Sequence, residues 1–325
     1  MSKRRINKQQ LARIEKNQQN YQETKGNNTN SLIDGLVITR FGKHVEIEDG
    51  EGNRIICSIR PNLDTVVAGD KIIWQPEGKN QGVVVSLYPR NSILARPTSK
   101  GLKKPVAANI SQMIIVTAPK PDISWPLLDS YLIMAEFLHL HAIILLNKVD
   151  MPCEELKTQL LADYQPLNYP IIMTSKKEPQ SFEPLKEALN HQISVFTGQS
   201  GVGKSSIIAE ILPHEQDIAI NEISSGAELG RHTTSNSRYY HLPSGGALID
   251  SPGVREFSLW DVDSSAIAQG YMEFRPFLSS CKFRNCTHIE TPSCAIIAAV
   301  EQKLISQRRY ENFIKLCTQF CKTQY

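Results

Sequence analysis

The segment Gly198–Ser205, Gly-Gln-Ser-Gly-Val-Gly-Lys-Ser, matches the pattern G-x-x-x-x-G-K-[S/T] of a phosphate-binding loop. It lies between a predicted strand at Ser194–Thr197 and a predicted helix at Ser205–Leu212. Glycines allow backbone N–H groups to surround phosphates, Lys204 can reach the β- and γ-oxygens, and the Ser205 hydroxyl can bind Mg²⁺. We therefore predict a nucleotide site, with Lys204 as a catalytic cation. Its predicted nucleotide-binding residues are Gly198, Gln199, Ser200, Gly201, Val202, Gly203, Lys204, Ser205 and Ser206.

A second motif selects the base. Asn147, Lys148, Val149 and Asp150 directly follow a predicted buried strand at Ala142–Leu146 and match N-K-x-D. The Asp150 carboxylate can accept hydrogen bonds from N1–H and the 2-amino group of guanine, which adenine does not offer, and the Lys148 stem can cover the base. The motif predicts GTP rather than ATP as the ligand.

A weaker signal adds to the guanine prediction. Ser175 and Lys176 follow another predicted strand end, where a backbone N–H could meet guanine O6.

Two further segments belong to a predicted γ-phosphate sensor. Asp250-Ser251-Pro252-Gly253 matches D-x-x-G, in which Asp250 would hold Mg²⁺ through water and Gly253 N–H would meet the γ-phosphate. Gly230–Thr234 has the composition of a switch loop, with Thr233 or Thr234 as a Mg²⁺ ligand. The alternative is an ordinary Ser/Thr-rich surface loop.

The order of these motifs is unusual, because N-K-x-D at 147–150 precedes the phosphate loop, whereas ordinary GTPases have the reverse order. We interpret this as a circular permutation, which the fold tolerates because the active-site loops share one sheet edge. The γ-phosphate sensor then leads directly into the C-terminal domain, so nucleotide state could move that domain.

A Cys-x4-Cys-x-His-x5-Cys cluster offers three thiolates and one imidazole, a set typical of a closed structural Zn²⁺ site. Its members are Cys281, Cys286, His288 and Cys294. The alternative is that unrelated cysteines happen to be close together. The neighbouring Phe283 and Arg284 favour a zinc knuckle that presents aromatic and basic groups to RNA. The remaining cysteines are interpreted as packing residues: Cys57, Cys153, Cys317 and Cys321.

The surrounding pattern predicts a multidomain α/β protein. Five short β-type runs indicate a small barrel of OB type, although an SH3-like barrel would have almost the same pattern. These runs are Gly35–Arg40, His44–Glu48, Arg54–Arg60, Lys71–Gln75 and Gly82–Leu87. A basic connector, Arg96–Lys104, follows the barrel.

Alternating strands and helices after the connector indicate a mostly parallel sheet with helices on both faces. The predicted strands are Met113–Thr117, Ala142–Leu146, Ile171–Thr174 and Ile193–Thr197, and Leu127–Leu138 is a predicted helix. Strands stop past about Asp261, and Ala295–Gln319 is expected to form one or two helices.

Composition agrees with a folded, soluble protein, since 41% of the 325 residues are hydrophobic and 21% are charged. The longest strongly apolar run, Ala142–Leu146, is far shorter than a membrane helix requires, and no secretory apolar segment follows the N-terminus, so we expect a cytoplasmic protein. The first 26 residues contain seven basic and two acidic residues, a net charge of +5. They are expected to form a flexible arm that contacts phosphates, or else a solubilising tail.

The barrel, the permuted motifs and the Cys/His knuckle together resemble the ribosome small-subunit-dependent GTPase A family. This resemblance covers residues from about 32 to 316. It implies an N-terminal OB-type barrel, a central circularly permuted P-loop GTPase domain and a C-terminal helical zinc-binding domain, with boundaries of 32–97, 98–261 and 262–325 after the arm at 1–31. It also implies a GTPase that is stimulated by the small ribosomal subunit and acts late in that subunit's maturation through rRNA binding.

The sequence also bears on how the attacking water is oriented. Val254 follows the D-x-x-G motif, where many GTPases carry the glutamine that orients water. His232 in the switch loop resembles the histidine proposed to do this in the family; the alternative is a solvent-exposed histidine.

Two other functions compete with this interpretation. One is a GTP-gated RNA-binding scaffold with incidental turnover, and the other is an ATP-dependent enzyme, which Asn147 and Asp150 disfavour. We expect a monomer that contains one structural Zn²⁺ and binds Mg²⁺ with GTP, and other assembly factors are conceivable partners.

Overall fold

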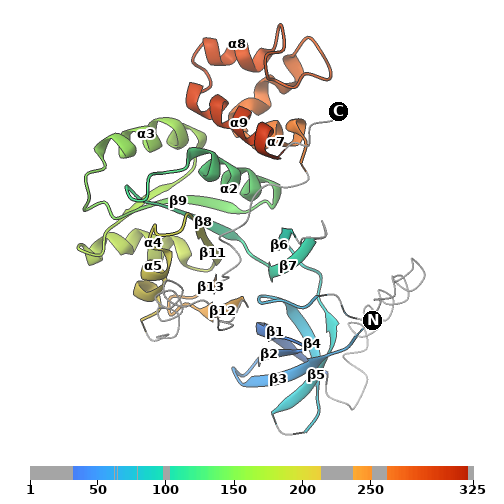
Figure 1. The fold of residues 1–325 in the computed structure, drawn as a ribbon. Helices are drawn as coiled ribbons and strands as arrows, with labels where there is room; N and C mark the ends of the chain where they lie inside the picture. Colours follow the sequence, from blue (N-terminus) through green and yellow to red (C-terminus); the bar gives the residue numbers. More distant parts are fainter. Residues whose placement is uncertain are drawn as a thin grey trace, which may run out of the picture. The chain divides into compact units, whose positions relative to one another are not determined.

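The computed structural model describes residues 32–61, 63, 65–78, 80–97, 103–213, 237–250 and 262–320. These residues form two compact units (Figure 1). The barrel unit contains the described residues up to Ile110 together with 237–241 and 247–250, and the α/β unit contains the described residues from Ser111 onward, except those. The predicted basic arm lies outside the described residues.

The five predicted barrel strands are all present. They are β1 (Ile33–Phe41), β2 (His44–Asp49), β3 (Arg54–Ile59), β4 (Lys71–Pro76) and β5 (Gln81–Leu87). Their order is β1-β2-β3-β5-β4, the β3–β5 pair is parallel, and β1 also pairs with β4 to close the barrel. This Greek-key order is that of an OB fold, so it resolves the alternative of an SH3-like barrel that the strand count left open.

Alternating side chains of these strands fill the barrel. Val37, Val45, Ile47 and Trp74 are among its buried core residues. A side chain at Gly82 would collide with Trp74, since a Cβ atom there would lie 2.5 Å from the indole ring. Glycine at position 82 therefore leaves the space that the Trp74 ring occupies beside β5.

The predicted basic connector has a different structure. Its ends belong to a hairpin of β6 (Ile93–Pro97) and β7 (Lys103–Ala108), which pair antiparallel. Leu94 and Ala107 are buried, whereas basic residues flank them. Basic residues and prolines interrupt the apolar residues of both strands, so the sequence shows no clear strand pattern there and suggested a connector.

A second hairpin was not predicted. It consists of β12 (Arg238–His241) and β13 (Ala247–Asp250) and joins the barrel sheet through a pairing of Thr39 with Arg238. Ion pairs reinforce this edge, since Arg238 contacts Glu46 at 3.1 Å. Each strand has only four residues, too few to produce a clear period in the sequence.

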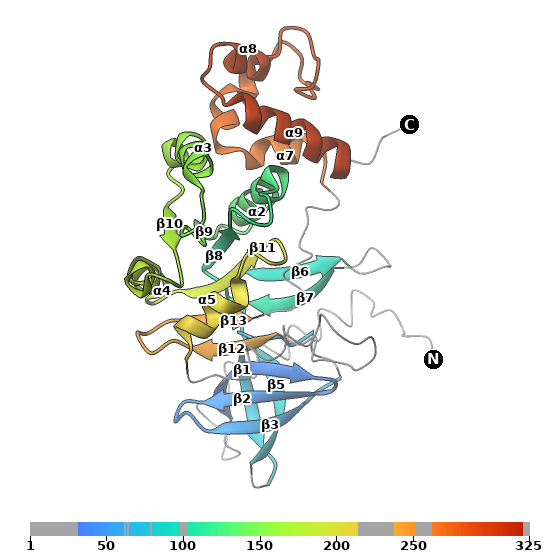
Figure 2. The ribbon, with the colours of Figure 1, turned by 60° about the vertical axis from the view of Figure 1, so that its left-hand side comes forward.

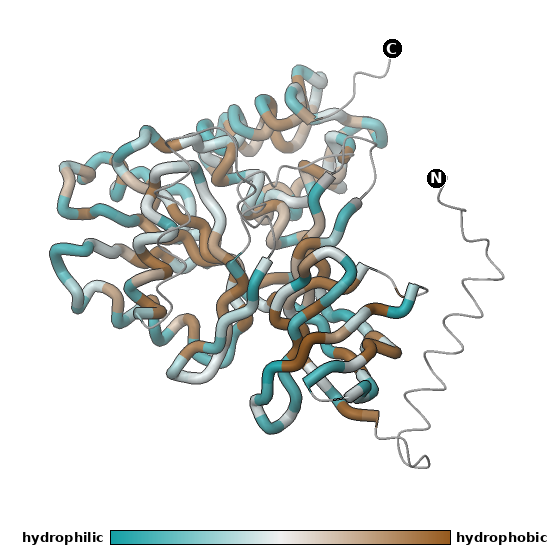
Figure 3. Tube along the Cα trace, turned by 60° about the horizontal axis from the view of Figure 1, so that its bottom comes forward, coloured by the Kyte–Doolittle hydropathy of each residue, from teal (hydrophilic) through white to brown (hydrophobic). Residues whose placement is uncertain are grey.

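The α/β unit contains a parallel sheet of four strands in the order β10-β9-β8-β11. These are β8 (Gln112–Thr117), β9 (His141–Asn147), β10 (Ile171–Thr174) and β11 (Ile193–Gly198), as predicted. Nearly all residues of β8, β9 and β11 are buried. Figure 3 shows hydrophobic residues gathered inside the units and hydrophilic residues along the surface loops.

Helices cover both faces of this sheet, as right-handed crossovers require. Helices α2 (Trp125–Phe137) and α3 (Glu154–Tyr164) lie on one face, and α4 (Glu183–Leu189) and α5 (Lys204–Ile211) lie on the other (Figures 1 and 2). Short 3-10 turns are η2 (Gln165–Leu167) and η3 (Pro179–Phe182). Helix α2 begins two residues before the predicted helix because Pro126 occupies its first turn.

The C-terminal part of the α/β unit is helical and packs on α2 (Figure 2). It contains α7 (Ser264–Gly270), η6 (Met272–Ser280), α8 (Ala295–Glu301) and α9 (Gln307–Phe320), so the predicted "one or two" final helices are two. Their core includes Phe274 and Phe313 and also Cys317, which is a packing residue as predicted. Among the described residues, no helix has the length and apolarity needed to cross a membrane.

Candidate functional site

The predicted phosphate loop connects the end of β11 to the start of α5. Gly198 and Gly203 have φ values of 137° and 101°, which L side chains rarely adopt. A Cβ atom on Gly198 would lie 2.2 Å from the Val116 carbonyl oxygen, and one on Gly203 would lie 2.4 Å from Asn147 Nδ2. Both glycines are therefore required for the loop to pass close to its neighbours.

Lys204 occupies the first turn of α5 and is only 9% exposed. Its ammonium donates hydrogen bonds to the carbonyl oxygens of Gly198 at 2.8 Å and Gln199 at 2.6 Å. The charge is thus held inside the curve of the loop, next to the N-terminus of α5, where an anion is favoured. Ser205, the predicted Mg²⁺ ligand, follows in the same turn.

Asn147 ties the predicted guanine motif to the phosphate loop. At the end of β9, its Nδ2 donates to the Val202 carbonyl at 2.9 Å, and its Oδ1 accepts from the Thr174 hydroxyl at 3.2 Å. Lys148 has a left-handed φ of 62°, and its ammonium donates to the carbonyls of Gly201 and Lys120 at 2.7 and 2.9 Å. Two motifs about 50 residues apart therefore form one structure.

Asp150 is held by two side chains from the loop after β10. The Ser175 hydroxyl donates to one carboxylate oxygen at 2.8 Å, and the Lys177 ammonium pairs with the other at 2.9 Å. The hydrogen bond from Lys177, aided by that from Ser175, lowers the pKa of Asp150. The carboxylate is therefore ionised at neutral pH and retains lone pairs for guanine donors.

The sequence prediction for this loop was Ser175 and Lys176. Ser175 is buried beside Asp150, whereas Lys176 is exposed. Lys177 was not predicted, because a lysine three residues beyond a strand end has no distinctive pattern. Only the turn that brings Lys177 back toward Asp150 identifies it.

Several predicted residues cannot be placed with this group. His232, Thr233, Thr234, Gly253 and Val254 lie outside the described residues. Asp250 is the last residue of β13 and belongs to the barrel unit. Their roles, and the residue-level assignment of the site as a whole, stay predictions from the motifs.

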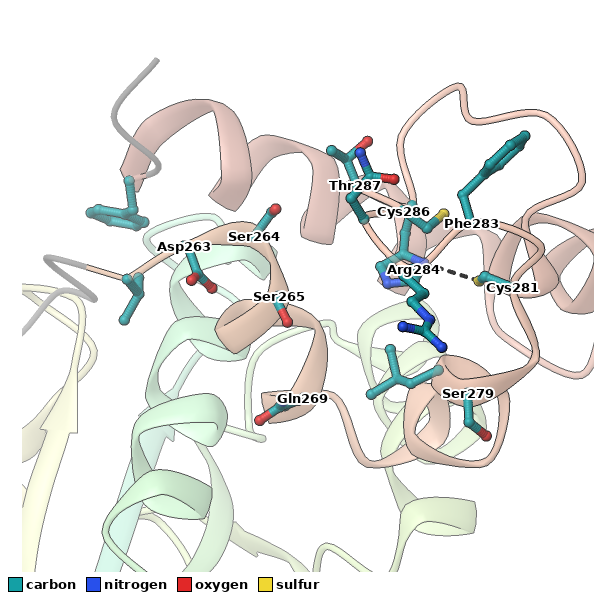
Figure 4. A pocket seen from close by; sticks show the side chains of 15 residues that line it. Asp263, Ser264, Ser265, Gln269, Ser279, Cys281, Phe283, Arg284, Cys286 and Thr287 are labelled. Atoms are coloured by element: carbon teal, nitrogen blue, oxygen red, sulfur yellow. Dashed lines mark hydrogen bonds between the residues drawn. The ribbon is translucent and has the colours of Figure 1, made fainter. Parts of the chain in front are cut away.

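The four predicted metal ligands do converge. The ligand atoms of Cys281, Cys286, His288 and Cys294 all lie within 4.8 Å of one another. His288 Nδ1 is 3.5 Å from the sulfur atoms of both Cys281 and Cys294. In Figure 4, Cys281 and Cys286 flank a loop from which Arg284 extends into the adjoining pocket. Three thiols and one imidazole at this spacing match a closed tetrahedral zinc site.

The surroundings of the cluster fit a cation. Burial raises the pKa of the Cys294 thiol to about 11 and lowers the pKa of His288, so His288 is a neutral ligand. A positive ion beside such a thiol favours its thiolate form, as a coordinated metal does. The Tyr310 hydroxyl donates to the His288 carbonyl at 3.0 Å, which anchors the knuckle to α9. The donor set therefore fits one structural Zn²⁺.

The comparisons with known proteins agree with this geometry. The family model described as RsgA GTPase matches residues 87–260. A Vibrio vulnificus (strain YJ016) relative, named small ribosomal subunit biogenesis GTPase RsgA 1, is 47% identical over 290 residues, which are 87% of this chain and 82% of the relative. This chain belongs to the RsgA GTPase family. The resemblance inferred from the motifs is thereby confirmed.

Other RsgA relatives extend the match to nearly the whole chain. A Photorhabdus laumondii protein named small ribosomal subunit biogenesis GTPase RsgA is 39% identical and covers 97% of this chain and 95% of its own length. The crystal structure of YjeQ from Thermotoga maritima has a TM-score of 0.73 and 30% identity, covering 89% of this chain and 98% of that one. The structure of YloQ, titled a circularly permuted GTPase, has a TM-score of 0.71 and 26% identity, covering 92% and 99%.

Proposed function

We propose that this RsgA-family GTPase hydrolyses GTP when it engages the small ribosomal subunit, late in the maturation of that subunit. The observation that supports this most strongly is the hydrogen bond from Asn147 to Val202, because it joins the guanine motif to the phosphate loop. The relatives named above are small ribosomal subunit biogenesis GTPases. The proposal places the chain in the cytoplasm, as a monomer.

Guanine specificity is assigned to Asp150. Its carboxylate, held by Ser175 and Lys177, would accept hydrogen bonds from N1–H and the 2-amino group of the base. Adenine lacks both donors, so binding ATP would leave the carboxylate partly unsatisfied, at a cost of about 1–3 kcal/mol for each lost partner. Lys148 would cover the base with its aliphatic stem.

The phosphates are assigned to the loop and to Lys204. The N–H groups of residues 201–206 and the Lys204 ammonium would neutralise charge on the β- and γ-phosphates. The motifs assign Ser205, Asp250 and Thr233 or Thr234 to Mg²⁺, and Gly253 to the γ-phosphate. Bound Mg²⁺ would stabilise the negative charge that develops on the transferred phosphoryl group.

Orientation of the attacking water is assigned to His232, since Val254 cannot perform it. An imidazole can accept a proton or a hydrogen bond from water, whereas a valine side chain can do neither. Intrinsic turnover should therefore be slow until the subunit orders the switch loop.

RNA contact is assigned to the barrel and to the zinc knuckle. In the barrel unit, Arg40, Arg96 and Lys104 line a groove of about 370 Å³, and none of the described residues that line it is acidic. In the α/β unit, Phe283 is 45% exposed and Arg284 extends from the same loop (Figure 4). Basic groups suit RNA phosphates, and an exposed ring suits an unstacked base.

The test is GTP turnover by the purified chain with and without small subunits, with large subunits and ATP as controls. We expect stimulation only by the small subunit and only with GTP. The alternative function, a GTP-gated RNA-binding scaffold, is favoured by Val254 and predicts tight GTP-dependent subunit binding without faster turnover. Elemental analysis should find one zinc per chain.

The catalytic assignment has its own test. His232→Ala should leave the GTP dissociation constant unchanged, because the imidazole is assigned to water and not to nucleotide. Subunit-stimulated turnover should fall by about 100-fold, within the range typical of a lost proton acceptor. Full stimulation in this variant would remove His232 from the mechanism.

A further inference from the structure

A buried ionic cluster fixes the C-terminal helices to the nucleotide-binding part of the α/β unit. Arg309 of α9 is 2% exposed and forms ion pairs with Asp129 of α2 and with Glu273, the latter at 2.7 Å. Its guanidinium lies 5.0 Å from the ring of Tyr164 on α3 and 4.5 Å from that of Tyr271. The zinc-binding domain is therefore clamped to α2 and α3.

The adjacent residue extends this contact to the first residue of α2. The Arg308 guanidinium lies 4.2 Å from the Trp125 ring centroid and pairs with Asp163 on α3 at 2.6 Å. The Trp125 ring also stacks on Tyr164, with centroids 6.2 Å apart and planes 6° apart. Any displacement of Trp125 must therefore change a contact with α9.

The segment before Trp125 is in turn bound to the phosphate loop. The Gln199 carboxamide accepts a hydrogen bond from Ser124 N–H at 2.9 Å and donates one to the Asp122 carbonyl at 3.2 Å. The Gln199 main-chain carbonyl accepts the 2.6 Å hydrogen bond from Lys204. Gln199 thus contacts the catalytic cation through its backbone and the start of α2 through its side chain.

We propose that Gln199 is a positioning residue that couples nucleotide binding in the phosphate loop to the zinc-binding domain, through Ser124, Trp125 and Arg308. Lys204 must divide its hydrogen bonds between the loop carbonyls and a bound phosphate, so nucleotide binding weakens its hydrogen bond to the Gln199 carbonyl and shifts the Gln199 backbone. The Gln199 side chain carries this shift to the start of α2 through its hydrogen bond with Ser124. Because such coupling is reciprocal, docking of the domain raises nucleotide affinity by the same factor.

This inference rests on nucleotide binding at the phosphate loop, as proposed above, but does not involve the switch segments. The chain contains three tryptophans, Trp74, Trp125 and Trp260. Labelling with 5-fluorotryptophan should yield one fluorine resonance from each, and Trp125→Phe assigns the reporter. GDP binding is measured separately with radiolabelled nucleotide.

We expect saturating GDP to shift the Trp125 resonance in the unsubstituted chain. In Gln199→Ala, the shift should fall by more than half, although the variant is saturated with GDP. The matched control is Gln159→Ala on α3, which removes a carboxamide that donates a hydrogen bond to Glu155 of the same helix, and it should retain the full shift. The effect in the opposite direction, from the domain contact to the nucleotide, is tested by Arg308→Ala. This variant should raise the GDP dissociation constant about fivefold, at the low end of typical coupling.

The outcomes separate the two proposals. GDP saturation without movement of the Trp125 resonance would overturn the coupling while leaving the nucleotide site intact. A full shift in Gln199→Ala would overturn the assignment of Gln199. Failure of the unsubstituted chain to bind GDP would overturn the nucleotide site itself, and the coupling with it.

Discussion

At the scale of single residues, the choice of base is assigned to Asp150 in the proposed site. Asp150→Asn replaces one acceptor oxygen by an amide that donates, so it opposes the 2-amino group of guanine and matches the 2-carbonyl of xanthine. We expect GTP affinity to fall about 100-fold and xanthosine triphosphate to become the preferred ligand. Competition binding measures this, with Asp122→Asn, whose side chain is 85% exposed, as the control. Unchanged preference for GTP would refute the assignment.

We expect Lys177 to set the pH below which the proposed site loses its nucleotide. Its ammonium is the main cause of the lowered pKa of Asp150, and the proposed guanine contact requires the carboxylate form. Binding should therefore be present above the pKa of Asp150 and be lost as pH falls through it. Lys177→Met raises that pKa toward its usual value, so loss of binding should begin at a higher pH.

The test is to measure the GDP dissociation constant from pH 3.5 to 7, roughly the range around the ordinary pKa of aspartate. Lys186→Met is a matched control, since Lys186 pairs with Glu183 on α4. If Lys177→Met and the unsubstituted chain lose GDP binding at the same pH, Lys177 does not act on Asp150.

At the scale of elements, Arg309 joins α9 to α2. Removing its charge leaves Asp129, which is fully buried, and Glu273 without their cation. Breaking a buried pair in this way costs about 3–5 kcal/mol. Burial and the nearby negative charge of Asp129 also raise the pKa of Tyr164 well above its usual value, so its hydroxyl remains a donor but cannot replace the lost charge.

Arg309→Met should accordingly lower the urea midpoint of the α/β unit strongly. Arg275→Met, which removes an exposed pair with Glu136, should change stability by no more than about 1 kcal/mol. Equal midpoints for these two variants would mean that the buried cluster does not hold the helices together.

At the scale of the whole molecule, the groove in the barrel unit should account for part of the salt dependence of subunit binding. Each phosphate contact contributes about 0.7–0.9 to the slope of log affinity against log salt concentration. Arg96→Ala with Lys104→Ala should therefore reduce the slope by about 1.5. Lys157→Ala with Lys186→Ala removes two cations already paired with glutamates in the α/β unit and should leave the slope unchanged. An unaltered slope in the groove variant would exclude this surface.

The sequence by itself determined the chemistry, because short motifs encode it directly. Gly198 and Gly203 are needed for backbone conformation, and Asp150 and the Cys/His cluster supply donor and acceptor sets that few other residues could replace. It also predicted the barrel strands and the parallel sheet, since their apolar periods are local properties of the chain. The four-residue strands β12 and β13 escaped prediction because so few residues define no period.

Only the tertiary structure decided which side chains support those motifs. Lys177 contacts Asp150, Gln199 contacts Ser124 and Arg309 contacts Asp129. No motif includes Lys177 or Arg309, and the phosphate-loop pattern leaves the residue type at position 199 open. The last two pairs are 75 and 180 residues apart in the chain. Contacts of this kind depend on how helices pack across a sheet, and the side chains that make them have no spacing that a linear pattern could reveal. The pairing of β1 with β4, which closes the barrel, likewise joins strands that are distant in the sequence and is not marked by any local pattern.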